Sequence, residues 1–96
     1  MGCVLCQDFT PYKRLRILRI LLDFKQQSFA DFLGISVVTY QKYENNEFKM
    51  SMELKEKFRY VGINAQWIDY GTGDPFSIER ELVIKNILRN TKNIKP

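Results

Sequence analysis

The residues most suited to chemistry are two cysteines near the start of the chain, Cys3 and Cys6, in the spacing C-V-L-C. This spacing occurs in zinc knuckles and in redox pairs. A structural zinc needs four ligands, and the 96-residue sequence has no other cysteine and no histidine. A metal bridging two chains is the alternative that this leaves open. We interpret the pair as ordinary reduced thiols and predict no metal, no cofactor and no enzymatic activity.

The composition indicates one folded, basic domain. Apolar residues make up 45% of the chain and aromatic residues 14%, which is enough for a compact core. Fifteen Lys and Arg against eleven Asp and Glu give a net charge of +4, which favours a polyanionic or acidic partner. No apolar run reaches the roughly 18 residues of a membrane span, and the start lacks the pattern of a secretory leader. We therefore expect a cytoplasmic protein with no membrane partner and no small-molecule ligand.

The spacing of the apolar residues predicts an all-α chain. In the first helix, expected to begin near residue 12, Leu15, Leu18 and Leu22 fall on one face. Its opposite face is also apolar, so this helix should be covered on both sides. Periodicity, capping residues and glycine stops predict five further helices, over residues 26–34, 37–45, 52–61, 65–70 and 77–92.

The apolar residues of the last helix do not form one stripe, which suggests contacts on two sides. The second apolar face of the first helix needs a cover: the N-terminal segment, the last helix or a partner chain. We favour a homodimer that uses this face and the last helix. The predicted dimer contacts are Ile78, Leu82, Ile84, Ile87 and Leu88.

The helices predicted over residues 26–34 and 37–45 have the pattern of a helix-turn-helix. Ala30 is small where the two helices would cross, and Gly34 tolerates the positive φ that the turn requires. Ser36 is a suitable N-cap for the second helix of the pair. Four apolar or aromatic residues can lock the two helices together: Leu33, Ile35, Tyr40 and Tyr43.

Two stretches of the sequence carry a resemblance to a family. RLRILRILLDFKQQSFADFLGIS resembles the R-L-x-x-L-R and Q-x-x-x-A-x-x-L-G-I-S motifs of the phage-repressor/Cro or XRE type of helix-turn-helix protein. YENNEFKMSMELKEKFRYVGINAQWIDYGTGDPF is similar to the ending of that family, L-G-V-x-x-x-W-L-x-x-G-x-G-x-P. The resemblance covers about residues 14–76. It implies a five-helix DNA-binding domain over residues 12–76, between an N-terminal arm at 1–11 and an additional C-terminal helix with a basic tail at 77–96.

The resemblance also implies a function and a set of contacts. Its members bind double-stranded DNA, and this chain would be a transcriptional repressor or phage-type regulator with the helix near 37–45 in the major groove. By position, the implied base contacts are Val37, Val38, Gln41 and Lys42. The implied phosphate contacts are Arg19, Gln26, Gln27, Ser36, Thr39, Asn45 and Lys49. Valines cannot hydrogen-bond to bases, so contact with a thymine methyl is the chemistry open to Val37 and Val38.

An alternative of another class is a protein-interaction module, such as an antitoxin or adaptor that binds a partner protein through the C-terminal helix. The two hypotheses differ in the effect of salt. Affinity for DNA falls steeply with ionic strength, whereas an apolar protein interface hardly responds to it.

Overall fold

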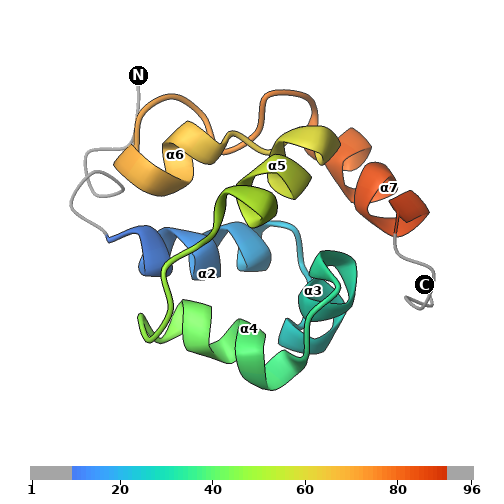
Figure 1. Cartoon of the computed structure of the whole chain (residues 1–96). Coiled ribbons are helices and arrows are strands. Elements are labelled where there is room, and N and C mark those ends of the chain that lie inside the picture. The colour runs from blue at the N-terminus through green and yellow to red at the C-terminus, as the bar shows by residue number, and fades with distance from the viewer. Residues whose placement is uncertain (1–9, 91–96) are drawn as a thin grey trace.

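The structure, a computed structural model of the chain, describes residues 10–90 and consists there of six α-helices without a β-strand. The helices are α2 (Pro11–Leu21), α3 (Gln26–Leu33), α4 (Val37–Glu44), α5 (Met52–Val61), α6 (Ala65–Tyr70) and α7 (Arg80–Asn90). In Figure 1, α2 and α5 run through the middle, α3 and α4 lie below them, and α6 and α7 lie toward opposite ends of the upper side. The predicted all-α class is confirmed. Cys3 and Cys6 lie outside the described residues.

The residues predicted to end and begin the paired helices do so. Gly34 follows α3 with a φ of 74°, in the left-handed region that glycine adopts without a steric penalty. Ser36 precedes α4, and its hydroxyl accepts a hydrogen bond from the Thr39 backbone N–H at 3.1 Å. Asn46, with a φ of 63°, takes the left-handed exit after α4. Local sequence therefore determines both sides of the turn.

The last helix begins at Arg80, three residues later than predicted. The cause is a short extended connection before it. The backbone N–H and the hydroxyl of Ser77 both donate to the Gly62 carbonyl, at 2.8 and 3.0 Å. An isolated antiparallel bridge joins Ile63 to Phe76 beside them. These contacts attach the connection to the end of α5 and hold residues 77–79 out of the helix.

The core is built around the fully buried ring of Phe29. Its centroid lies 5.7 to 6.1 Å from the centroids of four neighbouring rings: Phe24, Phe32, Tyr40 and Phe58. The predicted inner face of α2 packs into the same core, with Leu15, Leu18 and Leu22 fully buried. Trp67 is 3% exposed, as expected of a core residue. The aromatic cluster holds α3 and α4 against α5.

The helix α7 contributes one face to this core, which corrects one dimer prediction. Val83 and Ile87 are fully buried, and α7 contacts α3 and α5. Ile87 therefore belongs to the core of this chain and cannot contact a second one. Ile84 and Leu88 are half-buried.

Apolar side chains of α7 and of the connection before it face outward near the end of α2. Ile78 and Leu82 are 41% and 45% exposed, and Ile20 and Leu21 at the end of α2 are 59% and 42% exposed. The side chain of Arg80 joins the two elements, because its Nε donates to the Leu21 carbonyl at 2.6 Å. The second apolar face of α2 is thus covered only in part by the described residues.

None of the described helices has both the length and the apolar character that a membrane crossing requires.

Candidate nucleic-acid interface

The helices α3 and α4 meet across the three-residue turn 34–36. Ala30 is fully buried at their crossing, so its small side chain lets the two backbones approach. Tyr40 packs edge-on against Phe29 across the same junction, with ring centroids 5.7 Å apart. This packing fixes the direction in which α4 projects. The sequence-based prediction of a helix-turn-helix is confirmed.

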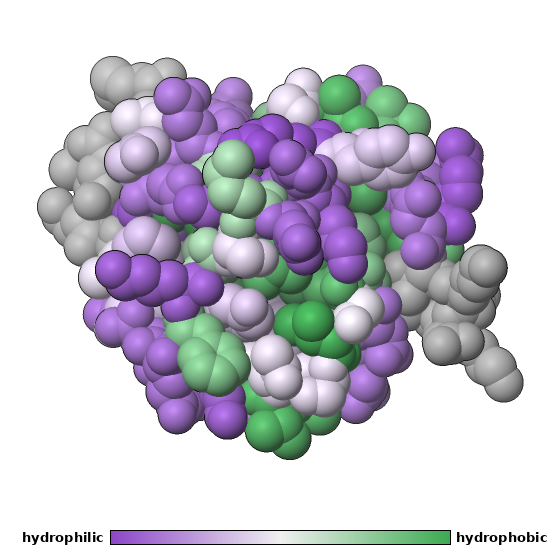
Figure 2. Space-filling model, viewed as in Figure 1, coloured by the Kyte–Doolittle hydropathy of each residue, from purple (hydrophilic) through white to green (hydrophobic). Residues whose placement is uncertain are grey.

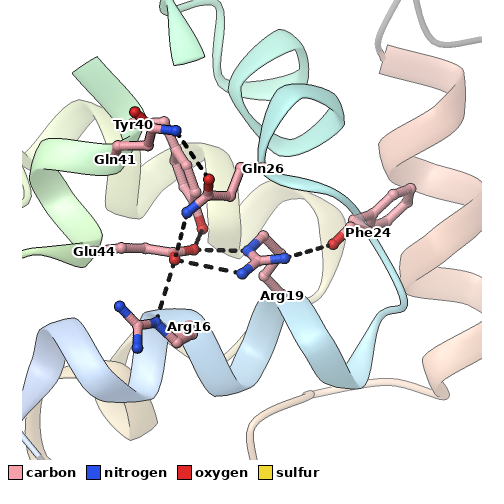
Figure 3. Close-up of polar contacts among 7 residues, drawn as sticks. All are labelled: Arg16, Arg19, Phe24, Gln26, Tyr40, Gln41 and Glu44. Carbon is pink, nitrogen blue, oxygen red and sulfur yellow. Dashed lines mark hydrogen bonds and ion pairs between the residues drawn. The ribbon is translucent and has the colours of Figure 1, made fainter. Parts of the chain in front are cut away.

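A buried carboxylate lies beneath α4 and ties it to α2 and α3 (Figure 3). The side chain of Glu44 is completely buried. Its Oε2 accepts a hydrogen bond from Arg19 Nε at 2.7 Å, and its Oε1 accepts one from Gln26 Nε2 at 3.1 Å. The hydroxyl of Tyr40 also donates to it, and Arg16, half exposed, lies with its Nε 3.5 Å from Oε1. We call these five residues the Glu44 network.

Protonation in the Glu44 network follows from burial and hydrogen bonding. Burial by itself would raise the pKa of the Glu44 carboxyl, but hydrogen bonds from Arg19, Tyr40 and Gln26 outweigh it and hold that pKa below its ordinary value. Burial would lower the pKa of Arg19, and its hydrogen bond and charge attraction to Glu44 raise that pKa instead. Burial and the hydrogen bond to Glu44 raise the pKa of Tyr40 far above its usual range. An ionised pair with a neutral phenol is therefore the form present at neutral pH.

The same network orients two residues implied to contact DNA, Gln26 and Gln41. A carboxylate can only accept hydrogen bonds, so Glu44 requires the Gln26 amide nitrogen to face it. The Gln26 oxygen then faces outward and accepts a hydrogen bond from Gln41 Nε2 at 3.1 Å. Figure 3 shows this chain from α2 through Glu44 to the two glutamines. The carboxamide of Gln41 is thereby fixed through the buried carboxylate.

The implied base contacts differ in their exposure. Val38 is 58% exposed in the first turn of α4. Figure 2 shows an apolar area at the lower edge of the molecule, over the start of α4, and further apolar areas in the middle and at the upper right of the same face. Val37 is half-buried and packs partly against the core. Gln41 and Lys42 are also half-buried.

Most of the implied phosphate contacts lie at the surface, but Arg19 does not. Its side chain is 15% exposed, with Nε on Glu44 and Nη1 donating to the Phe24 carbonyl at 2.9 Å. The guanidinium of Arg19 thus holds α2 to α4 and to the following turn, and only a small part of this side chain is exposed for the phosphate contact that the resemblance implies. The amide of Gln27 donates to Asp31 at 2.9 Å. The remaining residues are Gln26 and Thr39, which are half-buried, and the exposed Ser36, Asn45 and Lys49.

Several residues that shape this region have roles that were not predicted from the sequence. Glu44 lies in the second stretch that resembles the family, but its function as the shared hydrogen-bond acceptor depends on three helices meeting. Arg14 is 3% exposed and anchors α2 to α6, with Nε and Nη2 donating to the carbonyls of Ile68 and Asp69 at 2.7 and 2.8 Å. The signal in the sequence was the position of Arg14 on the same helix face as the buried leucines. A buried cation requires hydrogen-bond acceptors, so this position indicates that Arg14 has partners. Residues 10–90 contain no group of three or more His, Cys, Asp or Glu placed to hold a metal.

Comparison with known proteins gives one match. A family model described as Helix-turn-helix matches residues 15–54, which include most of α2, all of α3 and α4, and the beginning of α5. No curated protein and no solved structure matches the chain. The matched segment contains the buried junction of α3 and α4 and all five members of the Glu44 network.

Proposed function

We propose that residues 15–54, which match a helix-turn-helix family model, form a DNA-binding domain of the phage-repressor/Cro type, and that the chain uses it as a transcriptional repressor that occupies specific sites in double-stranded DNA. In this proposal α4 is the recognition helix and enters the major groove with its N-terminal turn leading. Repression follows from occupancy, because a bound protein excludes other proteins from the same stretch of duplex.

The observation that carries the proposal is the exposed leading end of α4 on a rigid support. Val38 projects from this end, while Tyr40 and Glu44 on the inner side of the same helix are buried. A recognition helix must hold its side chains in place before it contacts the bases, and the Glu44 network supplies that rigidity. Val38 offers a methyl surface for thymine, and Gln41 offers an amide for hydrogen bonding to a base edge.

Contacts to the DNA backbone supply affinity in this proposal. Gln26, at the N-terminus of α3, can present its backbone N–H to a phosphate, where the helix dipole favours a negative charge. Asn45 and Lys49 are exposed in the segment that follows α4. The net charge of +4 favours the approach to a polyanion. Such contacts fix the register of the protein without reading sequence.

We further propose that the repressor acts as a homodimer. The candidate interface consists of exposed apolar side chains at the end of α2, in the connection before α7 and in the first turn of α7: Ile20, Leu21, Ile78 and Leu82. A symmetric dimer would place two α4 helices about 34 Å apart on half-sites one helical turn apart. Leu82→Glu should convert the protein to a monomer in sedimentation experiments. Tyr60→Glu on α5, where the side chain is 77% exposed, is the matched control and should leave the dimer intact.

Selection of bound sequences from a random duplex pool tests the proposal as a whole. We expect an enriched site with two symmetric halves, and an affinity that falls with salt at a log–log slope of about −0.9 per phosphate contacted. Val38→Ala should change the preference at one T-containing position by about 1 kcal/mol without changing the stability of the protein. Tyr60→Ala is the control and should change neither. Equal binding to all sequences, or binding without a salt dependence, would contradict the proposal.

A further inference from the structure

Lys42, in the last turn of α4, lies against an aromatic ring of the following segment. Its ammonium is 5.2 Å from the centroid of the Phe48 ring. Phe48 is 45% exposed, and its other contact is an edge-on packing against Tyr43, with centroids 5.7 Å apart. A cation within about 6 Å of a ring is attracted by the negative face of that ring. The side chain of Lys42 is thus directed toward the segment after α4.

The position of the Phe48 ring is set by the backbone. The N–H groups of Glu47 and Phe48 both donate to the Lys42 carbonyl, at 2.8 and 3.3 Å. The chain therefore folds back over the last turn of α4 as it leaves the helix, with Asn46 in the left-handed conformation that allows this return. Because these bonds begin at Lys42 itself, the lysine and the ring are parts of one local structure.

The charge of Lys42 has no acidic partner among the described residues. No carboxylate of residues 10–90 lies within ion-pair distance of its ammonium, and the nearby Glu44 is occupied by Arg19. Lys49, directly after Phe48, is exposed and adds a second positive charge to the same segment. A cation held against an exposed ring, with a second cation at the next residue of the chain, suits the spaced charges of a sugar–phosphate backbone better than the edge of a base.

We propose that Lys42 contacts a backbone phosphate and not a base, and that Phe48 is the positioning residue that holds it there. This inference rests on the proposed function and changes the role first implied for Lys42 by position in the helix. A phosphate requires only a placed charge, whereas specific contact with guanine requires donors aimed at both O6 and N7. Base contacts are then left to Val37, Val38 and Gln41, so fewer side chains discriminate between DNA sequences.

A set of binding measurements with three variants tests this role. Lys42→Met keeps the length of the side chain and removes its charge. It should weaken binding to every duplex by the same factor, about eightfold at 0.1 M salt, and reduce the log–log salt slope by about 0.9. Phe48→Leu should also weaken binding to every duplex. In the Lys42→Met background Phe48→Leu should have no further effect, because the ring acts through the ammonium. Lys49→Met removes the second lysine proposed to contact a DNA phosphate, and it should also reduce the log–log salt slope of binding.

Two results would overturn the inference while leaving the proposed function in place. One is a change in the order of preferred bases at a single position in Lys42→Met, with the salt slope unchanged. The other is an equal effect of Phe48→Leu in the presence and absence of Lys42. If the unaltered protein bound no duplex, the proposed function would fail and the inference with it. Thermal unfolding of each variant separates loss of binding from loss of fold. We expect each variant to stay within about 1 kcal/mol of the parent, because Lys42 is only half-buried and Phe48 is 45% exposed.

Discussion

Replacing Glu44 by glutamine should destabilise the protein by about 3 kcal/mol. The carboxylate accepts hydrogen bonds from Arg19, Gln26 and Tyr40 in a fully buried position. An amide oxygen can retain two of these donors, and the new amide N–H groups would face the third. The loss of one charge-assisted hydrogen bond costs about 1.5 to 3 kcal/mol, and removal of one partner of a buried ion pair costs about 3 to 5 kcal/mol. Since the Arg19 side chain is 15% exposed, we take the lower part of that range.

Urea unfolding at pH 7, followed by circular dichroism, measures this free energy of unfolding. A loss of about 3 kcal/mol corresponds to a fall in Tm of about 10 to 25 °C for a domain of this size. Glu56→Gln on α5 is the matched control, because Glu56 is exposed and the change should stay within about 0.5 kcal/mol. If Glu44→Gln were as stable as the control, the reasoning about the Glu44 network would be refuted.

The same variant has a predicted dependence on pH. Because the pKa of Glu44 is held below its ordinary value of 4.5 in the folded protein, its stabilisation is fully present above that value. It is lost as the pH falls through the lower pKa of the folded state. The difference in stability between the parent and Glu44→Gln should therefore be constant from neutral pH to about pH 5 and shrink below about pH 4.5. If the difference in the free energy of unfolding grew on acidification, a titrating group other than Glu44 would dominate its pH dependence.

Two further changes test the packing that positions α4 and the segment before α7. Ala30→Leu should overpack the fully buried crossing of α3 and α4 and cost about 1 to 3 kcal/mol in urea unfolding, so a variant as stable as the parent would argue against a close crossing. Gly62→Ala should cost about 1 to 3 kcal/mol in thermal unfolding, because Gly62 has a φ of 100° and an added Cβ would lie 2.5 Å from the side chain of Ile78. Loss of less than 0.5 kcal/mol there would show that the connection before α7 moves aside at little cost.

Local features of the sequence determined the helices and the turn between α3 and α4. Gly34 and Ser36 act within a few residues of themselves, through a left-handed φ and a capping hydroxyl, so their effects could be predicted without the fold. The apolar spacing of Leu15, Leu18 and Leu22 likewise fixed the buried face of α2. Ala30 could be identified for the same kind of reason. A small residue at this spacing before the turn allows the two helices to cross closely.

The partners of the polar residues were decided by tertiary structure. Nothing in the spacing of Arg19, Gln26 and Glu44 says that one carboxylate serves donors from separate helices, because that requires α2, α3 and α4 to converge. The sequence likewise does not reveal which apolar residues of α7 are turned inward. Val83 and Ile87 face the core, while Leu82 remains 45% exposed, because the contacts of Ser77 with Gly62 set where the helix begins. Periodicity is a property of one helix, whereas burial and hydrogen-bond partners belong to the surfaces that helices make together.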